Sequence, residues 1–223
     1  VERTLKLMGG VGASPTWALS NHDSPRVVSR IGEVQARALT LFIFGLPGSC
    51  YVYQGQELGL PDAELADGDR QDPAFIRTKG AQKGRDGARV PLPWNGTHSP
   101  FGFTTGRPWL PVPQEWAKFT IEHQNADVAS SLALYRDVLV LRKELFGGVN
   151  DFEWTYSPDG SGLLGYRRGD IEVILNTSST PQKIFTNGIV EISSGGETIS
   201  MDRELVLGPI SCVWLRLLGE PKL

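Results

Sequence analysis

Cysteine, methionine and histidine are scarce in this chain, whose 223 residues include two Cys, two Met and three His. Cys50 and Cys212 lie far apart, each among apolar residues with strand propensity, so we expect two buried free thiols and no disulfide. Reduced thiols favour a cytoplasmic location. His98 and His123 have no partners at metal-ligand spacing, so the sequence indicates no zinc site, and no cofactor is expected.

Long apolar runs and an excess of one charge are also missing. The most apolar stretch, Leu39–Leu46, contains Gly45 and is far shorter than the roughly 20 residues that span a bilayer. Val1 leads directly into an amphipathic segment, so no signal peptide is indicated. The 22 Lys and Arg residues are scattered among 25 Asp and Glu residues. Neither nucleic acid nor an anionic membrane is therefore expected as a partner, and a hydrophobic content of 40% predicts a soluble globular protein.

Helical and strand patterns alternate in the first part of the chain. The helical segments carry apolar residues at helical spacing or good helix formers, and both stop at glycine. The strand segments are short and apolar. This alternation predicts an α/β protein with a parallel sheet. The expected order is helix Val1–Met8, strand Thr16–Leu19, helix Glu33–Phe44 and strand Ser49–Tyr53.

Polar side chains follow each of the two predicted strands. Asn21, His22 and Asp23 come directly after the first strand, and Pro25 prevents that strand from continuing. The polar run 54–57 follows the second strand. Because the carboxyl ends of parallel strands meet at one edge of a sheet, the sequence predicts a site at this edge.

Residues 59–124 show no regular periodicity and are rich in Pro, Gly and Asp. A loop of this length in a compact domain usually has a function. Arg and Asp side chains within 84–94 are suited to binding hydroxyl groups, and aromatic faces stack on the C–H surfaces of sugars. The exposed-looking aromatic residues of this stretch are Trp94, Phe101, Phe103 and Trp109.

The last part of the chain begins with a helix and then changes to short strands. Ser130–Phe146 carries an apolar stripe and ends at Gly147. The following strands, separated by turn signals at 158–160, 187–188 and 195–196, predict an antiparallel β-sandwich. The predicted strands are Phe152–Tyr156, Gly162–Arg167, Glu172–Asn176, Gln182–Phe185, Glu204–Leu207 and Cys212–Leu217.

Four ordered motifs resemble one known family: residues 17–26 (WALSNHDSPR), 53–61 (YQGQELGLP), 84–94 (GRDGARVPLPW) and 132–136 (LALYR). In this order and at these spacings they resemble the C-terminal part of bacterial α-glucosidases of the α-amylase superfamily. The resemblance implies about the last two strands of a catalytic (β/α)8 TIM barrel over residues 1–147, with an active-site loop at 59–124. A C-terminal antiparallel β-sandwich would then occupy residues 148–223.

The family resemblance also implies an activity, namely retaining and exo-acting hydrolysis of terminal α-linked glucose from oligosaccharides or disaccharides. Such enzymes use a nucleophile and an acid/base whose carboxyl groups are about 5 to 5.5 Å apart. In the family both come from earlier strands, so neither belongs to this chain. By resemblance, Asp23 is a third carboxylate that stabilises the transition state, and His22 and Arg85 bind the substrate. The residues expected to support the pocket are Asn21, Arg26, Gln56 and Glu57.

Each of these side chains also has a purely structural interpretation. Asp23 could cap the turn before the proline, and His22 could be an ordinary loop histidine. Glu57 could equally be a solvated or helix-capping acid. The arginines could form structural ion pairs, Arg26 with an acid of the site and Arg89 with Asp86.

Two other functions compete with hydrolysis. One is a trehalose-forming or otherwise transglycosylating relative of the α-glucosidases. The other is a non-catalytic fragment that binds sugars or a protein partner, if the protein is truly this short. Two strands cannot close a barrel and would leave sheet edges open, so the chain by itself is expected to be inactive. The sequence is compatible with both a monomer and an oligomer.

Overall fold

A computed structural model describes residues 1–157, 160–195, 198–199 and 203–218 of the chain. These residues form two compact units. The first, which we call the sheet unit, comprises 1–17, 34–50 and 136–223, and the second, the loop unit, comprises 18–33 and 51–135. The division of the protein into domains at residues 147 and 148 stays a prediction.

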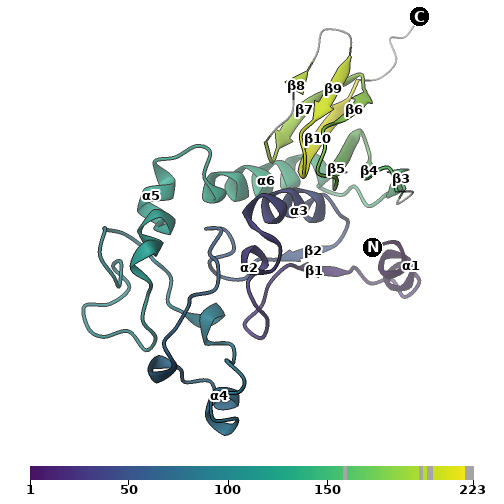
Figure 1. Ribbon diagram of the computed structural model, residues 1–223. Coiled ribbons are helices and arrows are strands. Elements are labelled where there is room, and N and C mark those ends of the chain that lie inside the picture. The colour runs from purple at the N-terminus through teal and green to yellow at the C-terminus, as the bar shows by residue number, and fades with distance from the viewer. Residues whose placement is uncertain (158–159, 196–197, 200–202, 219–223) are drawn as a thin grey trace, which may run out of the picture. The chain divides into compact units, whose positions relative to one another are not determined.

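The predicted helices and the first strands lie close to where the sequence pattern placed them, but the helix Val27–Ile31 was not predicted because its five residues show no apolar period (Figure 1). Helix α3 begins at Glu33 and ends at Phe44, as predicted, because its alanine-rich start favours helix and Gly45 follows its end. The second strand is shorter than predicted and ends at Tyr51. The bounds are α1 Glu2–Gly9, β1 Thr16–Ala18, α2 Val27–Ile31, α3 Glu33–Phe44, β2 Ser49–Tyr51 and α6 Ser131–Phe146, and β1 lies beside β2 in a two-stranded sheet.

The strands after α6 form two antiparallel sheets, as the sequence predicted. One sheet has the order β3-β4-β5-β10-β7 and the other the order β6-β9-β8. Side chains of both sheets share one apolar core, which includes Ile174 and Val213 from the first and Ile184 and Leu205 from the second. The bounds are β3 Glu153–Tyr156, β4 Leu163–Arg168, β5 Ile171–Asn176, β6 Gln182–Phe185, β7 Gly188–Ser193, β8 Thr198–Ile199, β9 Glu204–Leu207 and β10 Ser211–Leu217.

Strands β7 and β8 were not predicted. Strand β7 begins at Gly188, which the sequence pattern assigned to a turn, and its side chains are at most half-buried, so the apolar alternation is weak. The predicted turn residues 158–159 and 196 lie outside the described residues.

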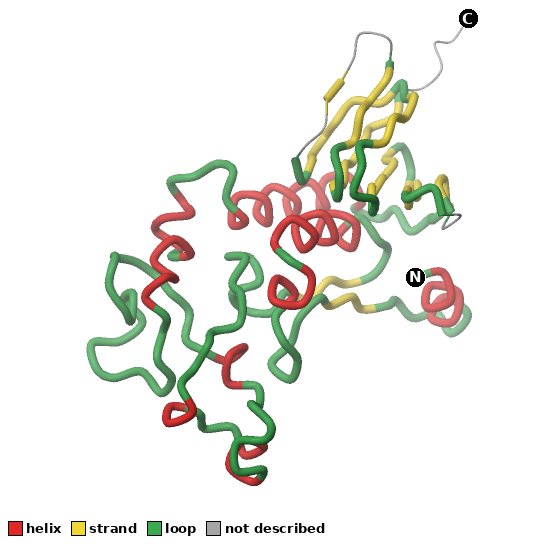
Figure 2. The backbone as a smooth tube through the Cα atoms, viewed as in Figure 1, coloured by secondary structure: helices red, strands yellow, loops and turns green. Residues whose placement is uncertain are grey.

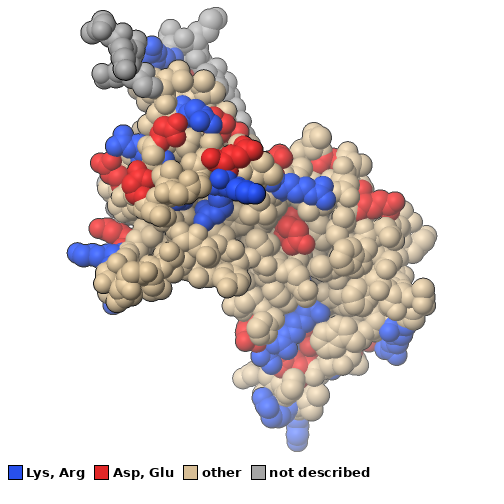
Figure 3. Space-filling view, turned by 180° about the vertical axis from the view of Figure 1, so that it is seen from behind, with Lys and Arg blue, Asp and Glu red and all other residues tan. Residues whose placement is uncertain are grey.

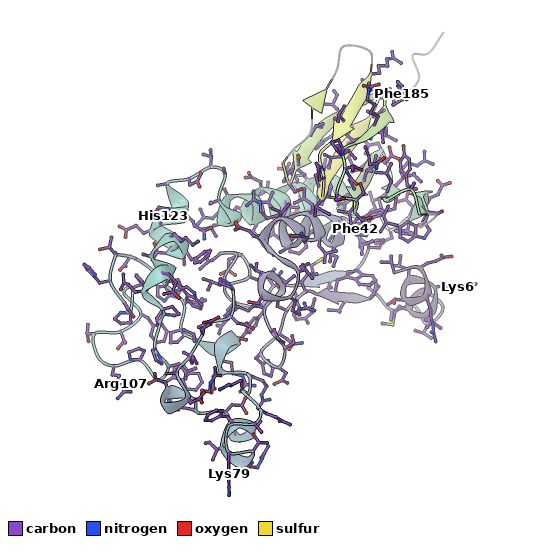
Figure 4. The ribbon with its side chains drawn as sticks, viewed as in Figure 1. Lys6, Phe42, Lys79, Arg107, His123 and Phe185 are labelled. Carbon is purple, nitrogen blue, oxygen red and sulfur yellow. The ribbon has the colours of Figure 1, made fainter. Side chains whose placement is uncertain are left out.

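Within the sheet unit, side chains of the late strands donate hydrogen bonds to the backbone of α3. The Tyr166 hydroxyl lies 2.5 Å from the Phe42 carbonyl oxygen, and Trp214 Nε1 lies 3.0 Å from that of Leu41. The Phe42 and Tyr166 rings also meet edge to face, with centroids 5.1 Å apart. Figure 4 labels Phe42 on this helix. Because Tyr166 and Trp214 are fully buried, these contacts fix α3 against the five-stranded sheet.

Replacing Tyr166 with Phe is expected to lower the free energy of unfolding by about 1 to 3 kcal/mol, because the buried Phe42 carbonyl would lose its side-chain donor. Denaturant unfolding of the two proteins measures the difference. The matched control is Tyr51→Phe, since Tyr51 is 65% exposed. Equal loss in both variants would contradict the assigned hydrogen bond.

The stretch predicted as a structureless loop contains short helices and a core of its own (Figure 2). That core is built around Phe101, Leu110 and Trp116, and Leu58 and Leu132 from just outside the stretch complete it. Helix α4 starts at the Asp72-Pro73 pair, a typical helix start, but its five residues are too few for an apolar period. The bounds are η1 Asp67–Asp69, α4 Pro73–Arg77, η2 Asp86–Arg89, η3 Gln114–Phe119 and α5 Ile121–Asn125.

Several expectations from composition can be compared with the structure directly. Both cysteines are free thiols, as predicted, but only Cys212 is buried, whereas Cys50 is half-buried; burial raises the pKa of each. No helix among the described residues is long and apolar enough to cross a bilayer. On the face shown in Figure 3, basic and acidic side chains are interspersed. Of the four exposed-looking aromatic residues, Phe101 is buried in the loop-unit core, whereas Trp94, Phe103 and Trp109 are exposed.

Candidate active site

The turn after β1 presents the Asp23 side chain to solvent. The Asn21 side-chain oxygen accepts hydrogen bonds from the Asp23 backbone N–H at 2.8 Å and from the Ser24 hydroxyl at 3.3 Å. This is the local hydrogen bonding that asparagine commonly provides in turns. Asn21 therefore shapes the turn, and no hydrogen bond joins its side chain to the Asp23 carboxylate in the part of the chain described here.

The Asp23 carboxylate is held by two arginines. Its Oδ1 accepts hydrogen bonds from Arg85 Nη1 at 2.6 Å and from Arg89 Nη2 at 2.9 Å. Its Oδ2 lies 3.4 Å from His22 Nε2. The hydrogen bond from Arg85, and then the charges of His22, Arg85 and Arg89, lower the pKa of Asp23 below its usual range. The carboxylate is thus ionised at neutral pH, and its side chain remains 55% exposed.

Arg85 is anchored in turn by a second carboxylate, that of Asp72. Asp72 Oδ2 accepts hydrogen bonds from Arg85 Nε at 2.8 Å and from the Arg85 backbone N–H at 2.9 Å. Asp72 Oδ1 accepts from the backbone N–H of Ala74 at 2.8 Å and so caps α4. The Asp72 side chain has no exposed surface. The Arg85 guanidinium that binds Asp23 is therefore held in place by the buried Asp72 carboxylate, which accepts a hydrogen bond from its Nε.

The backbone around Asp72 is held by Asp86. Asp86 Oδ2 accepts from the backbone N–H groups of Gln71 at 2.7 Å and Asp72 at 2.8 Å. The prediction that Asp86 forms an ion pair with Arg89 is wrong, because each of the two side chains binds other partners. Arg89 binds Asp23 and, through Nε, the backbone carbonyl of His22 at 2.8 Å.

The contacts of Asp72 predict how stability depends on pH. The hydrogen bond from Arg85 is the main cause that lowers the pKa of Asp72 well below its usual range. A carboxyl group whose pKa is lower in the folded state stabilises the fold above its unfolded pKa of about 3.9, and that contribution is lost as pH falls through the folded value. Denaturant midpoints between pH 5 and pH 2 should therefore fall less steeply for Asp72→Asn than for the wild-type protein. A variant at exposed Glu115, Glu115→Gln, should keep the wild-type slope, and equal slopes for all three would contradict the assignment.

Arg26 follows the turn, and its side chain forms no ion pair with an acid of the site among the described residues, in contrast to the expectation. Its side chain is 1% exposed and donates to the backbone carbonyls of Gln54 at 2.7 Å and Ala88 at 2.9 Å. Its guanidinium also lies 4.9 Å from the centre of the Tyr53 ring. Burial is the main cause that lowers the pKa of Arg26. Backbone carbonyls therefore take the place of the expected carboxylate. Through them the Arg26 side chain links the backbone at residues 54 and 88.

Gln56 and Glu57 are not joined to Asp23 by any hydrogen bond or ion pair within the described ranges. Gln56 is buried, and its Nε2 donates to the Tyr135 hydroxyl at 2.7 Å. Glu57 is half-buried, burial raises its pKa, and its Oε2 has no hydrogen-bond partner. Both side chains are therefore separate from the His22, Asp23 and Arg85 cluster in the described structure.

The structure brings together three of the predicted site residues, His22, Asp23 and Arg85. It adds two that sequence reasoning did not assign to the site, Asp72 and Arg89. The helix-start pattern at Asp72-Pro73 was the available signal for Asp72, although it does not reveal the bond to Arg85. His123 lies on α5 (Figure 4), and no group of three or more potential metal ligands occurs among the described residues.

Comparisons with known proteins give consistent results. The family model described as alpha amylase, catalytic domain, matches residues 3–147. A probable α-glucosidase of Rhizobium meliloti (strain 1021) is 40% identical over 133 residues, which are 57% of this chain and 24% of that protein. The trehalose-6-phosphate hydrolase of Escherichia coli (strain K12) is 32% identical over 177 residues, which are 66% of this chain and 31% of that protein.

A solved structure is similar over almost the whole chain. It is that of an α-glucosyl transfer enzyme, XgtA, with a TM-score of 0.78 at 28% sequence identity. The similarity covers 96% of this chain and 42% of that one. The chain thus spans about a quarter to a third of the two curated relatives and less than half of this structural neighbour.

Proposed function

The chain belongs to the α-amylase catalytic-domain family, and from this we propose that it is part of a retaining, exo-acting α-glucosidase. The whole protein would release terminal α-linked glucose from oligosaccharides or disaccharides. Strands β1 and β2 would be the seventh and eighth strands of its barrel, and the two sheets after α6 would form a C-terminal domain. The nucleophile and the acid/base would come from earlier strands outside this chain.

In this proposal Asp23 stabilises the transition state. Its carboxylate accepts hydrogen bonds from sugar hydroxyls next to the reacting carbon, above all the 2-hydroxyl. As the ring approaches an oxocarbenium ion, that hydroxyl becomes a stronger donor, so the bond strengthens in the transition state. His22 donates to the same ring, and Arg85 holds the non-reducing-end glucose, which makes the pocket exo-acting.

One observation carries the proposal: the exposed Asp23 carboxylate is fixed in place before any sugar binds. Arg85 and Arg89 bind one carboxylate oxygen, and the buried Asp72 fixes Arg85. Groups already aligned in the free protein need no reorganisation at the moment of reaction, which is how fixed charges contribute to catalysis. A solvated loop acid with no function would not need this support.

The test is hydrolysis of 4-nitrophenyl α-glucoside by the full-length protein, followed by proton NMR of the sugar released first. We expect the α-anomer of glucose. The β-anomer would contradict a retaining mechanism, and no release from α-glucosides would contradict the proposed activity. Residues 1–223 alone are expected to give no turnover, because both reacting carboxyl groups would be missing.

The similarity to an α-glucosyl transfer enzyme supports a second candidate, transfer of glucose to a sugar acceptor. Both functions share a glycosyl-enzyme intermediate and differ in whether water or a sugar attacks it. Chromatography of products from a concentrated disaccharide separates the two. Free glucose as the main product supports hydrolysis, and longer or rearranged saccharides support transfer.

A further inference from the structure

We propose that a cavity lined by residues of the sheet unit binds a small oxyanion of the phosphate class. The cavity has a volume of about 280 Å³. Three of its lining side chains are basic: Arg142 and Lys143 from the end of α6, and Arg168 from β4. Gly48 and Asn150 also line it.

Arg168 is a buried cation with an unused donor. It is 3% exposed, and its guanidinium lies 4.3 Å from the centre of the Phe146 ring. Its two terminal nitrogens donate to the backbone carbonyls of Gly45, at 2.8 Å, and Val149. Its Nε is buried and has no hydrogen-bond partner in the described part of the chain. Burial, and next the charge of Arg142, lower the pKa of Arg168 to about 10, so it is still cationic at neutral pH.

Among the described residues, the hydrogen bonds of the Arg142 side chain also go to backbone carbonyls. Its Nη1 donates to Phe44 and, at 3.0 Å, to Leu46, and its Nη2 donates to Gly48. Helix α3 has no basic residue in its last turn, so Arg142 and Arg168 supply the positive charge that favours its C-terminus. The C-terminus of α3 therefore accounts for the position of the two arginines. It does not account for their full charge, which is larger than the partial negative charge of one helix end.

The charges around the cavity do not balance. A helix C-terminus carries about half a negative charge, so the ends of α3 and α6 together supply about one. Three side chains supply the opposite charge, and none of them forms an ion pair with a carboxylate among the described residues. The Asp151 carboxylate accepts a hydrogen bond from the Gly169 backbone N–H, and its charge raises the pKa of Arg168, so it offsets about one of the three positive charges.

A tetrahedral oxyanion fits this setting. It offers several acceptor oxygens to donors that approach from different sides, and hydrogen bonds between ionised groups are stronger than neutral ones. Lys143 and Asn150 are exposed, so an anion can reach the cavity from solvent. The exposed Lys143 ammonium group would contact the anion directly, and Arg142 and Arg168, which also line the cavity, would supply further positive charge.

The experiment is calorimetric titration of the full-length protein with inorganic phosphate. Sodium chloride is used to keep the ionic strength constant. We expect saturable binding at one site. Lys143→Met should raise the Kd about tenfold, the value of one charge-assisted contact. Lys118→Met is the matched control, because Lys118 is exposed and lies in the loop unit, and it should keep the wild-type Kd.

Arg142→Met should abolish binding, and Arg142→Lys, which keeps the charge, should restore part of it. If Arg142→Met fails to fold, the comparison of Lys143→Met with Lys118→Met still decides. The absence of saturable phosphate binding would overturn the proposal. That result is expected if a carboxylate from another part of the whole protein fills the cavity. Equal Kd values for Lys143→Met and Lys118→Met would also overturn it.

Discussion

Replacing Asp23 with Asn in the full-length protein is expected to lower kcat/KM for an α-glucoside by about a thousandfold. Asparagine has nearly the same shape but no negative charge. It therefore cannot give the charge-assisted hydrogen bonds that strengthen as the sugar ring gains positive charge. The loss should appear mainly in kcat, because bonds of equal strength in the ground state would change KM instead.

The matched control for Asp23→Asn is Asp67→Asn. Asp67 is also an exposed carboxylate that accepts a charged hydrogen bond, from Lys83 at 2.6 Å, and it lies in the same unit. It should leave kcat unchanged. Unfolding of both variants must stay cooperative with midpoints like that of the wild type. Retention of most of the rate by Asp23→Asn would show that Asp23 does not stabilise the transition state.

Replacing Asp72 with Ala is the second change with a large expected effect. It removes the acceptor for Arg85 and the cap of α4 together, so the free energy of unfolding should fall by about 2 to 3 kcal/mol. Arg85 would then lose its anchor, and misplacement of a binding group by about 1 Å lowers a rate roughly a hundredfold. Denaturant unfolding and kcat/KM on one preparation measure both effects.

A milder variant separates the two roles of Asp72. Asp72→Asn keeps a side-chain oxygen that can cap α4, so most of the stability should return. The uncharged amide binds Arg85 less strongly, so kcat/KM should recover only in part. If Asp72→Ala kept the wild-type kcat/KM, the proposed support of the site by Asp72 would be wrong.

The sequence predicted elements with a strong local signal. The bounds of α3 are as predicted, and α6 begins one residue later than expected, at Ser131, because glycine and apolar periodicity mark both helices. Strand β7 was missed because its glycine start resembled a turn. The short helices within 59–124 have too few residues to show a period, and tertiary packing around Trp116 determines them.

The site was predictable only in part, for a similar reason. A polar cluster directly after a strand singled out Asp23, and a family motif singled out Arg85 as a substrate contact, but the hydrogen bond between the two side chains was not predicted. The pairing of Asp23 with Arg89 joins residues 66 positions apart, and the bond from Arg85 to Asp72 joins residues 13 apart in an irregular loop. No local pattern specifies such contacts, because the loop conformation that creates them depends on its own core.

The most direct test of the account compares two substrates on two enzymes. The kcat/KM values are measured for 4-nitrophenyl α-glucoside and its 2-deoxy analogue, with the wild-type protein and with Asp23→Asn. If Asp23 accepts a hydrogen bond from the 2-hydroxyl, the effects on kcat/KM of removing the hydroxyl and of removing the carboxylate charge are not additive. We predict that removing the hydroxyl lowers kcat/KM at least about tenfold more in the wild type than in the variant, which corresponds to one charge-assisted hydrogen bond. Equal ratios in the two proteins would contradict the account, because Asp23 and the hydroxyl would then act independently.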